Sequence, residues 1–267
     1  MQLRSGEREI LVISDSQRMG AAMAWHAGAA PRKVVLPLDT AASDDLEGMA
    51  WLSDASGPHL YTLTSSGAVR RFVPDGAGGL RRDGDAYRIG APPLSCADLR
   101  SINCGKNWEG LCLRHPDGIG RCAGYAASKA ETALYCVTRN AAGRLAVDPD
   151  HAPIHLTLEG VLGHRDVLSD CAFGAAGGPA EDILLITTNV YGGSATYLVD
   201  EVTGRAEPLD VVTTPSNEAI TVDSRGALYA FMDDNGETSI AARFDCSGWR
   251  SPDSVQSATR LVPSAPR

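Results

Sequence analysis

The chain has 267 residues, and its 24 basic against 33 acidic residues give a net charge of −9 at pH 7. An acidic surface repels phosphate backbones, which excludes nucleic acid as a natural partner. No apolar run reaches the roughly 18 residues that a membrane-spanning helix needs. The 28 glycines and 15 prolines favour a fold with many turns over a helix bundle.

The chain begins with a polar segment, residues 1–9, which carries no signal peptide and leads at once into a predicted strand at residues 9–15. This abrupt start indicates either a leader that has been removed or a missing first strand. We expect a periplasmic or secreted protein whose leader is absent from this sequence.

Four segments share one pattern, in which a polar residue, an acidic residue and a small residue precede apolar residues that alternate with period two. They are residues 45–51, 107–113, 168–173 and 216–222. Each predicts a short strand with a carboxylate near its start. A turn and a more hydrophobic second strand follow each, at residues 59–64, 133–138, 183–188 and 227–232, and residues 9–15 are a fifth copy of this second strand. Third strands are predicted at residues 68–73, 195–199 and 240–244, and a fourth strand at 33–38.

Four antiparallel strands per repeat predict an all-β fold, a single β-propeller, with five blades favoured and six allowed. The predicted blades lie near residues 1–43, 44–105, 106–165, 166–214 and 215–267, in one domain that spans residues 1–267. The first blade lacks its innermost strand. Because an open ring would leave two unpaired edges, we expect residues 257–262 to help close it.

Five of the seven cysteines lie between Cys96 and Cys136. Cys96 and Cys104 flank a loop, and Cys112 and Cys136 lie in two strands that we expect to pair. Both couples are candidate disulfides, and this clustering favours an oxidising compartment. The alternative is that the cysteines are buried, inert thiols.

The innermost strands of a propeller line a central channel, so their starts lie together at one mouth. This places Glu47, Glu109, Asp170 and Glu218 around that mouth. Converging carboxylates either raise their pKa values or bind a cation, so these four are the predicted ligands of a divalent cation, Ca²⁺ above others. The alternative is that the acids bond backbone amides of the neighbouring blade and serve only as repeat architecture.

Residues that depart from the repeat are the other site candidates. His164 is the predicted proton-transfer group, because an imidazole titrates near neutrality, although a solvated loop histidine is the plainer interpretation. Arg165 is suited to holding an anionic group, and Asn107 is the third predicted catalytic residue. The predicted substrate-binding residues are Lys106, Trp108, Arg139, Asn189, Tyr191 and Asn217.

Four motifs resemble those of a known family. Asp-Leu-Glu-Gly-Met-Ala at residues 45–50, Trp-Glu-Gly-Leu at 108–111 and Ser-Asn-Glu-Ala-Ile-Thr-Val-Asp at 216–223, with Ile-Ser-Asp at 13–15, are similar to the SdiA-regulated and phytase-like esterase group of β-propellers. The chain more distantly resembles the gluconolactonase propellers, which hold a divalent metal at the channel mouth. The resemblance implies an exported bacterial propeller, often metal-binding and sometimes assigned ester or phosphoester hydrolysis. Asp170 and Cys171 depart from the pattern, and the gluconolactonase Ser-Asn-Gly sequence is absent.

Three hypotheses remain open at this point. The first is a metal-dependent hydrolase of esters, lactones or phosphoesters. The second is a non-enzymatic propeller that binds a small molecule, a peptide or another protein at the channel mouth, and the third is a tailoring enzyme of a biosynthetic pathway. We expect a monomer in each case.

Overall fold

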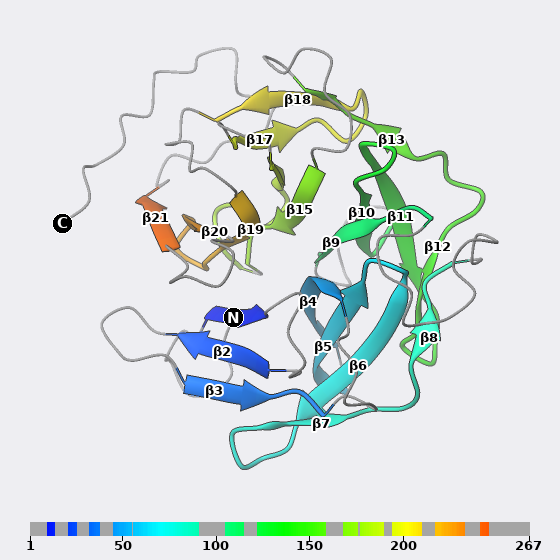
Figure 1. The fold of residues 1–267 in the computed structure, drawn as a ribbon, viewed down its shortest axis with the longest axis vertical. Coiled ribbons are helices and arrows are strands. Elements are labelled where there is room, and N and C mark those ends of the chain that lie inside the picture. The colour runs from blue at the N-terminus through cyan, green and yellow to red at the C-terminus, as the bar shows by residue number, and fades with distance from the viewer. Residues whose placement is uncertain are drawn as a thin grey trace.

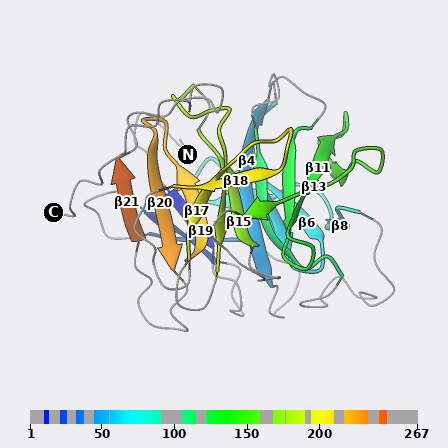
Figure 2. The same cartoon turned by 90° about the horizontal axis from the view of Figure 1, so that it is seen from above.

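The computed structural model describes residues 10–13, 21–25, 32–37, 45–54, 56–90, 105–114, 122–158, 168–175, 177–189, 194–209, 217–232 and 241–245. Every regular element in these ranges is a β-strand, and the strands form five sheets arranged around a common centre (Figure 1). Seen from the side, long strands such as β4 and β20 run from one face of the ring towards the other (Figure 2). The predicted all-β propeller is therefore confirmed.

Each sheet is built from strands that follow one another in the chain. The first holds β1 (Ile10–Ile13), β2 (Ala21–Trp25) and β3 (Arg32–Val35). The second holds β4 (Leu46–Asp54), β5 (Gly57–Thr64), β6 (Ala68–Pro74), β7 (Leu80–Arg82) and β8 (Tyr87–Arg88). The third holds β9 (Trp108–Leu113), β10 (Gly124–Ser128), β11 (Ala133–Arg139), β12 (Leu145–Val147) and β13 (Ile154–His155).

The fourth sheet holds β15 (Leu168–Phe173), β16 (Leu184–Thr188), β17 (Thr196–Val199) and β18 (Arg205–Pro208), and β14 (Thr157–Leu158) adds to it parallel to β18. The fifth holds β19 (Asn217–Val222), β20 (Ala227–Met232) and β21 (Ala241–Asp245). The predicted count of five four-stranded blades is not reproduced, because only three of the sheets contain four strands or more among the described residues. Residues 257–262, expected to close the ring, lie outside those residues.

Strand β10 changes the prediction for the third sheet. Residues 133–138 were expected to form its second strand, but they form the third, because β10 pairs with both β9 and β11. Four of the five residues of β10, Gly-Tyr-Ala-Ala-Ser, are small, and they show no clear alternation of polar and apolar residues, so the sequence pattern does not predict a strand there. The extra strand reverses the chain direction, so the end of β11 lies at the opposite edge from the one expected.

A β-bulge near the start of each inner strand disrupts the pairing at the same place in four sheets. The bulged residues are Glu47 in β4, Glu109 in β9, Ser169 in β15 and Glu218 in β19. The predicted alignment placed Asp170 with the three glutamates, but the bulge gives that position to Ser169. Asp170 instead occupies the next position along, where the other inner strands have Gly48, Gly110 and Ala219.

Glycine at this next position allows neighbouring inner strands to approach closely. A Cβ at Gly48 would lie 2.6 Å from the Leu111 backbone nitrogen, and one at Gly110 would lie 2.7 Å from Asp170 Oδ1. Both distances are shorter than packed atoms adopt, so the Glu-Gly pairs of the repeat are required by the contacts of β4 with β9 and of β9 with β15. The apolar core fills the spaces between adjacent sheets, with Tyr61 and Leu111 between the second and third.

Candidate functional site

A lysine that the sequence analysis did not single out lies beside the starts of the inner strands. Lys129 follows β10 in a turn, and its Nζ lies 3.1 Å from Glu109 Oε2. Burial by itself lowers the pKa of Lys129, but the charges of Glu109, Glu218 and Glu47 outweigh it and raise that pKa above its usual value. Three predicted metal ligands from three different inner strands therefore act on one ammonium group.

Backbone contacts hold Lys129 against the loop that precedes β9. Its N–H donates to the Asn107 carbonyl over 3.0 Å, and Ser128 Oγ donates to the Lys106 carbonyl over 2.7 Å. The position of Lys129 thus depends on β10, the strand that the sequence reading missed. Knowledge of that strand would have placed Lys129 in the turn beside the inner-strand starts.

Asn107 combines a strained backbone with an unmet hydrogen-bond acceptor. Its φ of 46° lies in the left-handed region, which asparagine tolerates better than most side chains. Its Nδ2 donates to Glu109 Oε1 over 3.1 Å, which orients the amide and leaves the buried Oδ1 without a hydrogen-bond partner among the described residues. An orphaned buried carbonyl beside a carboxylate that is 3 % exposed has the chemistry of a cation ligand set.

Asp170 is buried and makes a different kind of contact. Its Oδ2 accepts the Ile220 backbone N–H of the neighbouring inner strand over 3.0 Å, and its Oδ1 accepts the Cys171 N–H over 2.8 Å. Burial, and secondarily the charges of Glu218 and Glu109, raise the pKa of Asp170 well above its usual range. A carboxylate that bonds the backbone of the adjacent blade matches the architectural alternative for this acid.

Two predicted substrate-binding asparagines lie near Glu218. Asn189 follows β16, and its Nδ2 donates to Glu218 Oε1. Asn217 is 2 % exposed, and its Nδ2 donates to Thr187 Oγ1 over 3.1 Å while its carbonyl accepts from Ser169 Oγ over 2.8 Å. Asn189 therefore belongs to the mouth, whereas Asn217 joins β19 to the preceding sheet.

Lys106 and Trp108 are engaged with one tyrosine of β11. Lys106 Nζ bonds Glu131 and lies 2.5 Å from the Tyr135 hydroxyl oxygen. The Trp108 ring packs edge-on against Tyr135 with 5.3 Å between centroids, and Trp108 is only 7 % exposed. Trp108 is thus a buried packing residue, whereas the Lys106 side chain is 36 % exposed and its ammonium is paired with Glu131.

Arg139 lies away from the mouth, contrary to the prediction. Its guanidinium bonds Asp54 at the end of β4, and its Nε donates to the Tyr61 hydroxyl over 3.2 Å. Asp54 is seven residues along β4 from Glu47, or roughly 20 Å at the usual rise of a strand. Arg139 lies at this end of the sheet because the additional strand β10 reverses the direction of β11. His164, Arg165 and Tyr191 lie outside the described residues.

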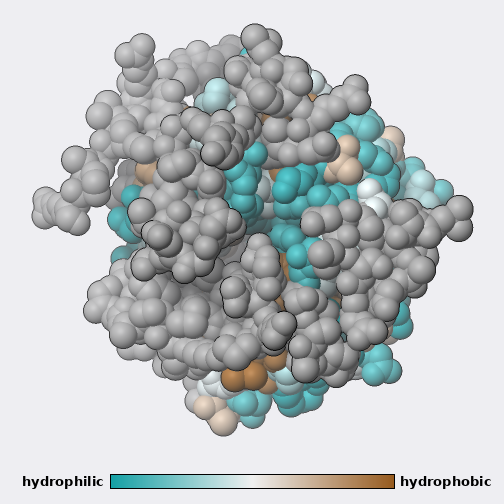
Figure 3. Space-filling model, viewed as in Figure 1, coloured by the Kyte–Doolittle hydropathy of each residue, from teal (hydrophilic) through white to brown (hydrophobic). Residues whose placement is uncertain are grey.

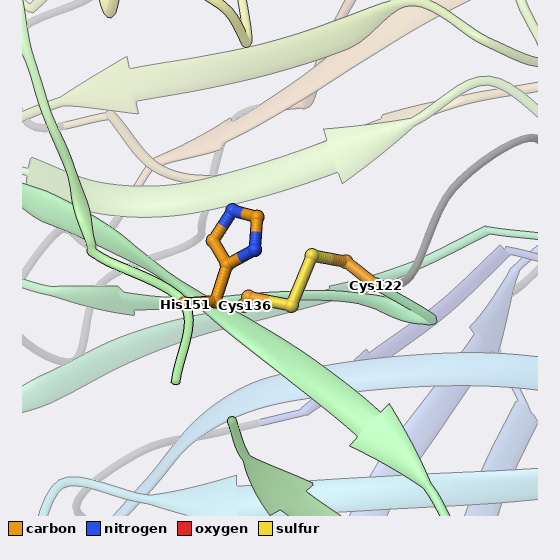
Figure 4. Close-up of side chains that lie close together, drawn as sticks. All are labelled: Cys122, Cys136 and His151. Atoms are coloured by element: carbon orange, nitrogen blue, oxygen red, sulfur yellow. A yellow bond between two sulfur atoms is a disulfide. The ribbon is translucent and has the colours of Figure 1, made fainter. Parts of the chain in front are cut away.

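One group of three potential metal ligands among the described residues has its ligand atoms within 4.8 Å of one another: Cys122, Cys136 and His151 (Figure 4). Cys122 and Cys136 are joined by a disulfide, so their sulfurs are not thiolate ligands in this state. Among the described residues, the carboxylates at the channel mouth do not form such a group of three with ligand atoms within 4.8 Å of one another.

A second disulfide joins Cys112 of β9 to Cys171 of β15 and so links the inner strands of adjacent sheets. The predicted pair Cys112–Cys136 is wrong. Tyr125 of β10 pairs with both cysteines and lies between them in the row, which separates them by two strand spacings. The other predicted pair, Cys96–Cys104, lies outside the described residues.

The visible atoms around the centre of the face shown in Figure 3 are mostly hydrophilic. None of the described residues belongs to a helix long and apolar enough to cross a membrane.

Comparison with known proteins finds similarity of fold at low sequence identity. A "putative 6-phosphogluconolactonase" from Bacteroides uniformis is 12 % identical with a TM-score of 0.45, over 91 % of this chain and 65 % of that one. TolB from Acinetobacter baumannii is 12 % identical with a TM-score of 0.42, over 90 % of this chain and 50 % of that one. The β-propeller domain of Cps50 (Swd1) from Myceliophteria thermophila is 13 % identical with a TM-score of 0.38, over 88 % and 68 %.

The chain thus spans 65 % and 50 % of the length of the first two of these structures. No family model matches the sequence. No curated protein matches it either.

Proposed function

We propose that the channel mouth of this propeller binds a divalent cation, Ca²⁺ by preference, and hydrolyses an ester, lactone or phosphoester. The observation that carries the proposal is the orphaned Asn107 Oδ1 beside the buried carboxylate of Glu109. Amide and carboxylate oxygens are the ligands that Ca²⁺ prefers, and a buried acceptor without a donor is stabilised by a cation.

Glu109, Glu47 and Glu218 act with Asn107 as the ion-binding set. The charges of all three carboxylates raise the pKa of Lys129, which supports this set because one positive charge already interacts with all three. Lys129 Nζ leaves Glu109 when the ion binds and becomes available to an anionic part of the substrate. A bound divalent cation polarises the scissile carbonyl or phosphoryl group and lowers the pKa of water.

His164 and Arg165 keep their predicted roles in the proposal, whereas Asn189 and Asp170 take supporting ones. His164 transfers protons and Arg165 binds an anionic group. Asn189 orients Glu218, and Asp170 holds the inner strands β15 and β19 together beneath the site. The two disulfides support an oxidising compartment, and hence a periplasmic or secreted location.

Metal analysis of the purified protein, with and without chelator, tests the proposal. We expect Ca²⁺ to bind the chelated protein and to raise its melting temperature, as mass action requires. Glu109→Gln should remove both effects and the hydrolysis of nitrophenyl esters or phosphoesters that depends on Ca²⁺. The matched control is Glu207→Gln, because the Glu207 side chain on β18 is 37 % exposed and bonds Arg205.

Absence of any bound cation, with Ca²⁺-independent stability in wild type and Glu109→Gln alike, would refute the proposal. The propeller would then be better explained by ligand binding without catalysis.

A further inference from the structure

A second polar cluster lies at the other end of the second sheet, in the hairpin between β4 and β5. Ser56 is exposed in the turn, and its Oγ lies 2.8 Å from His59 Nε2. His59 is 6 % exposed on β5, so its ring is held by packing while its Nε2 reaches the hydroxyl. A hydroxyl within hydrogen-bond distance of an imidazole is the arrangement of an activated nucleophile and its base.

The other nitrogen of the ring lacks a hydrogen-bond partner. His59 Nδ1 is buried and unpartnered among the described residues, and it faces Asp83 Oδ2 at 3.8 Å. Arg71 Nε holds that same Asp83 oxygen at 2.7 Å. A carboxylate beside a ring nitrogen favours the tautomer that carries its proton there, so Asp83 favours a proton on Nδ1 while Asp54, 3.5 Å from Nε2, favours one on Nε2. The tautomer with its proton on Nδ1 is the one that leaves the Nε2 lone pair directed at Ser56. A closing movement of about 1 Å would complete the hydrogen bond from Nδ1 to Asp83.

A competing acceptor for the Ser56 hydroxyl is Asp54. Its Oδ1 accepts a hydrogen bond from the Ser56 hydroxyl over 2.5 Å and lies 3.5 Å from His59 Nε2. The hydrogen bond from Ser56, assisted by the Arg139 guanidinium, holds the pKa of Asp54 below its usual value. An imidazole is intrinsically the stronger base by about 2.5 pKa units, so a proton that leaves Ser56 during an attack goes to the ring.

The space beside Ser56 is open. Gly57 has a φ of +114°, and a Cβ there would meet no described atom within 4 Å. Gly57 adopts this conformation without steric cost, and the exposed Ser56 hydroxyl lies next to room for a small acyl group.

We propose that Ser56 and His59 form a second, metal-independent hydrolytic site for small esters, with Asp83 as a positioning residue. His59 Nε2 takes the hydroxyl proton as Ser56 Oγ forms a bond to the ester carbonyl carbon. The bond to the leaving oxygen breaks, and the alcohol departs with the proton returned by His59. Water then attacks the acyl-serine, giving one proton to His59, and Ser56 recovers a proton as the carboxylic acid leaves.

A fluorophosphonate probe on the full chain tests the site, with peptide mass spectrometry to locate the label. We expect covalent labelling at Ser56 in the presence of EDTA and unchanged labelling in Glu109→Gln, which separates this site from the channel mouth. Ser56→Ala should abolish the label, and Ser53→Ala, a change at an exposed serine of the same hairpin, should not. His59→Gln should slow labelling by about 100-fold or more, the usual contribution of a general base.

Asp83→Asn tests the positioning role. We expect it to lower the labelling rate constant at saturating probe without changing the probe concentration that gives half that value. Loss of folded protein would instead lower the final extent of labelling and leave the rate constant of the folded molecules unchanged. Circular dichroism of each variant identifies any that fails to fold. If His59→Gln does not fold, Ser56→Ala and Asp83→Asn still test the proposal. Labelling of Ser56 no faster than that of Ser53, or EDTA-resistant ester hydrolysis that survives in Ser56→Ala, would overturn the proposal.

Discussion

Replacement of Lys129 by methionine tests the electrostatic centre of the channel mouth. The side chain of Glu109 is 4 % exposed and that of Lys129 is 27 % exposed, so the change leaves a buried carboxylate without its cation. Removing one partner of a buried ion pair costs about 3–5 kcal/mol, and the partial exposure of Lys129 favours the lower end, about 3 kcal/mol. For a chain of this size this corresponds to a fall in melting temperature of roughly 6–12 °C.

Urea unfolding followed by circular dichroism measures the loss, first in EDTA and then in Ca²⁺. The double variant Lys129→Met with Glu109→Gln should recover most of the loss, because no uncompensated charge remains. If the ammonium competes with Ca²⁺, then Ca²⁺ should stabilise Lys129→Met more than wild type at the same concentration. A hundredfold excess over the variant's own dissociation constant should stabilise the variant by about 2.7 kcal/mol relative to its Ca²⁺-free form. Lys106→Met is the control, because its surface pair with Glu131 should contribute less than about 1 kcal/mol.

A loss below about 1 kcal/mol in Lys129→Met, no recovery in the double variant and an unchanged response to Ca²⁺ would refute the reasoning. The three glutamates would then not depend on Lys129 for compensation.

Further outcomes can be checked on the same preparations. Gly110→Ala should destabilise the fold by about 1–3 kcal/mol in urea unfolding, because its Cβ would meet Asp170 Oδ1 at 2.7 Å, and an unchanged midpoint would contradict the close packing of β9 on β15. Replacing Cys112 and Cys171 by alanine should cost about 4 kcal/mol, since the bridge spans 59 residues, and peptide mapping of wild type should find this pair linked. Because the folded-state pKa of Asp170 is raised above 3.8, its contribution to stability should fall as pH rises from 3.8 through the raised value. Asp170→Asn should remove that part of the pH dependence of unfolding, and a stability profile identical to wild type would count against it.

The repeated acid-small-apolar pattern was sufficient to predict the inner strands. The predicted segments at residues 45–51, 107–113 and 168–173 correspond to β4, β9 and β15, because short-range alternation and turn residues determine strands locally. The glutamates expected at one mouth, Glu47, Glu109 and Glu218, all act on Lys129, and their role as ion ligands stays a prediction. Ser169 and Asp170 show the limit, because a bulge shifts the register by one residue without leaving a mark in the sequence pattern.

Strand β10 accounts for most of the other differences. Its small residues pack well only because β9 and β11 flank it, so its stability comes from partners distant in the sequence. Because the sequence analysis did not predict this strand, it placed Arg139 at the mouth, did not identify Lys129 and paired Cys112 with the wrong cysteine.

The sequence by itself determined the all-β propeller and the carboxylates at the starts of its inner strands, because both depend on residues close together in the chain. Only the tertiary structure decided which charge those carboxylates meet, which cysteines join and that Ser56 faces His59 beside Asp83. These contacts depend on register, on strand direction and on the packing of one sheet against the next, and each can be changed by one inserted strand or one bulged residue.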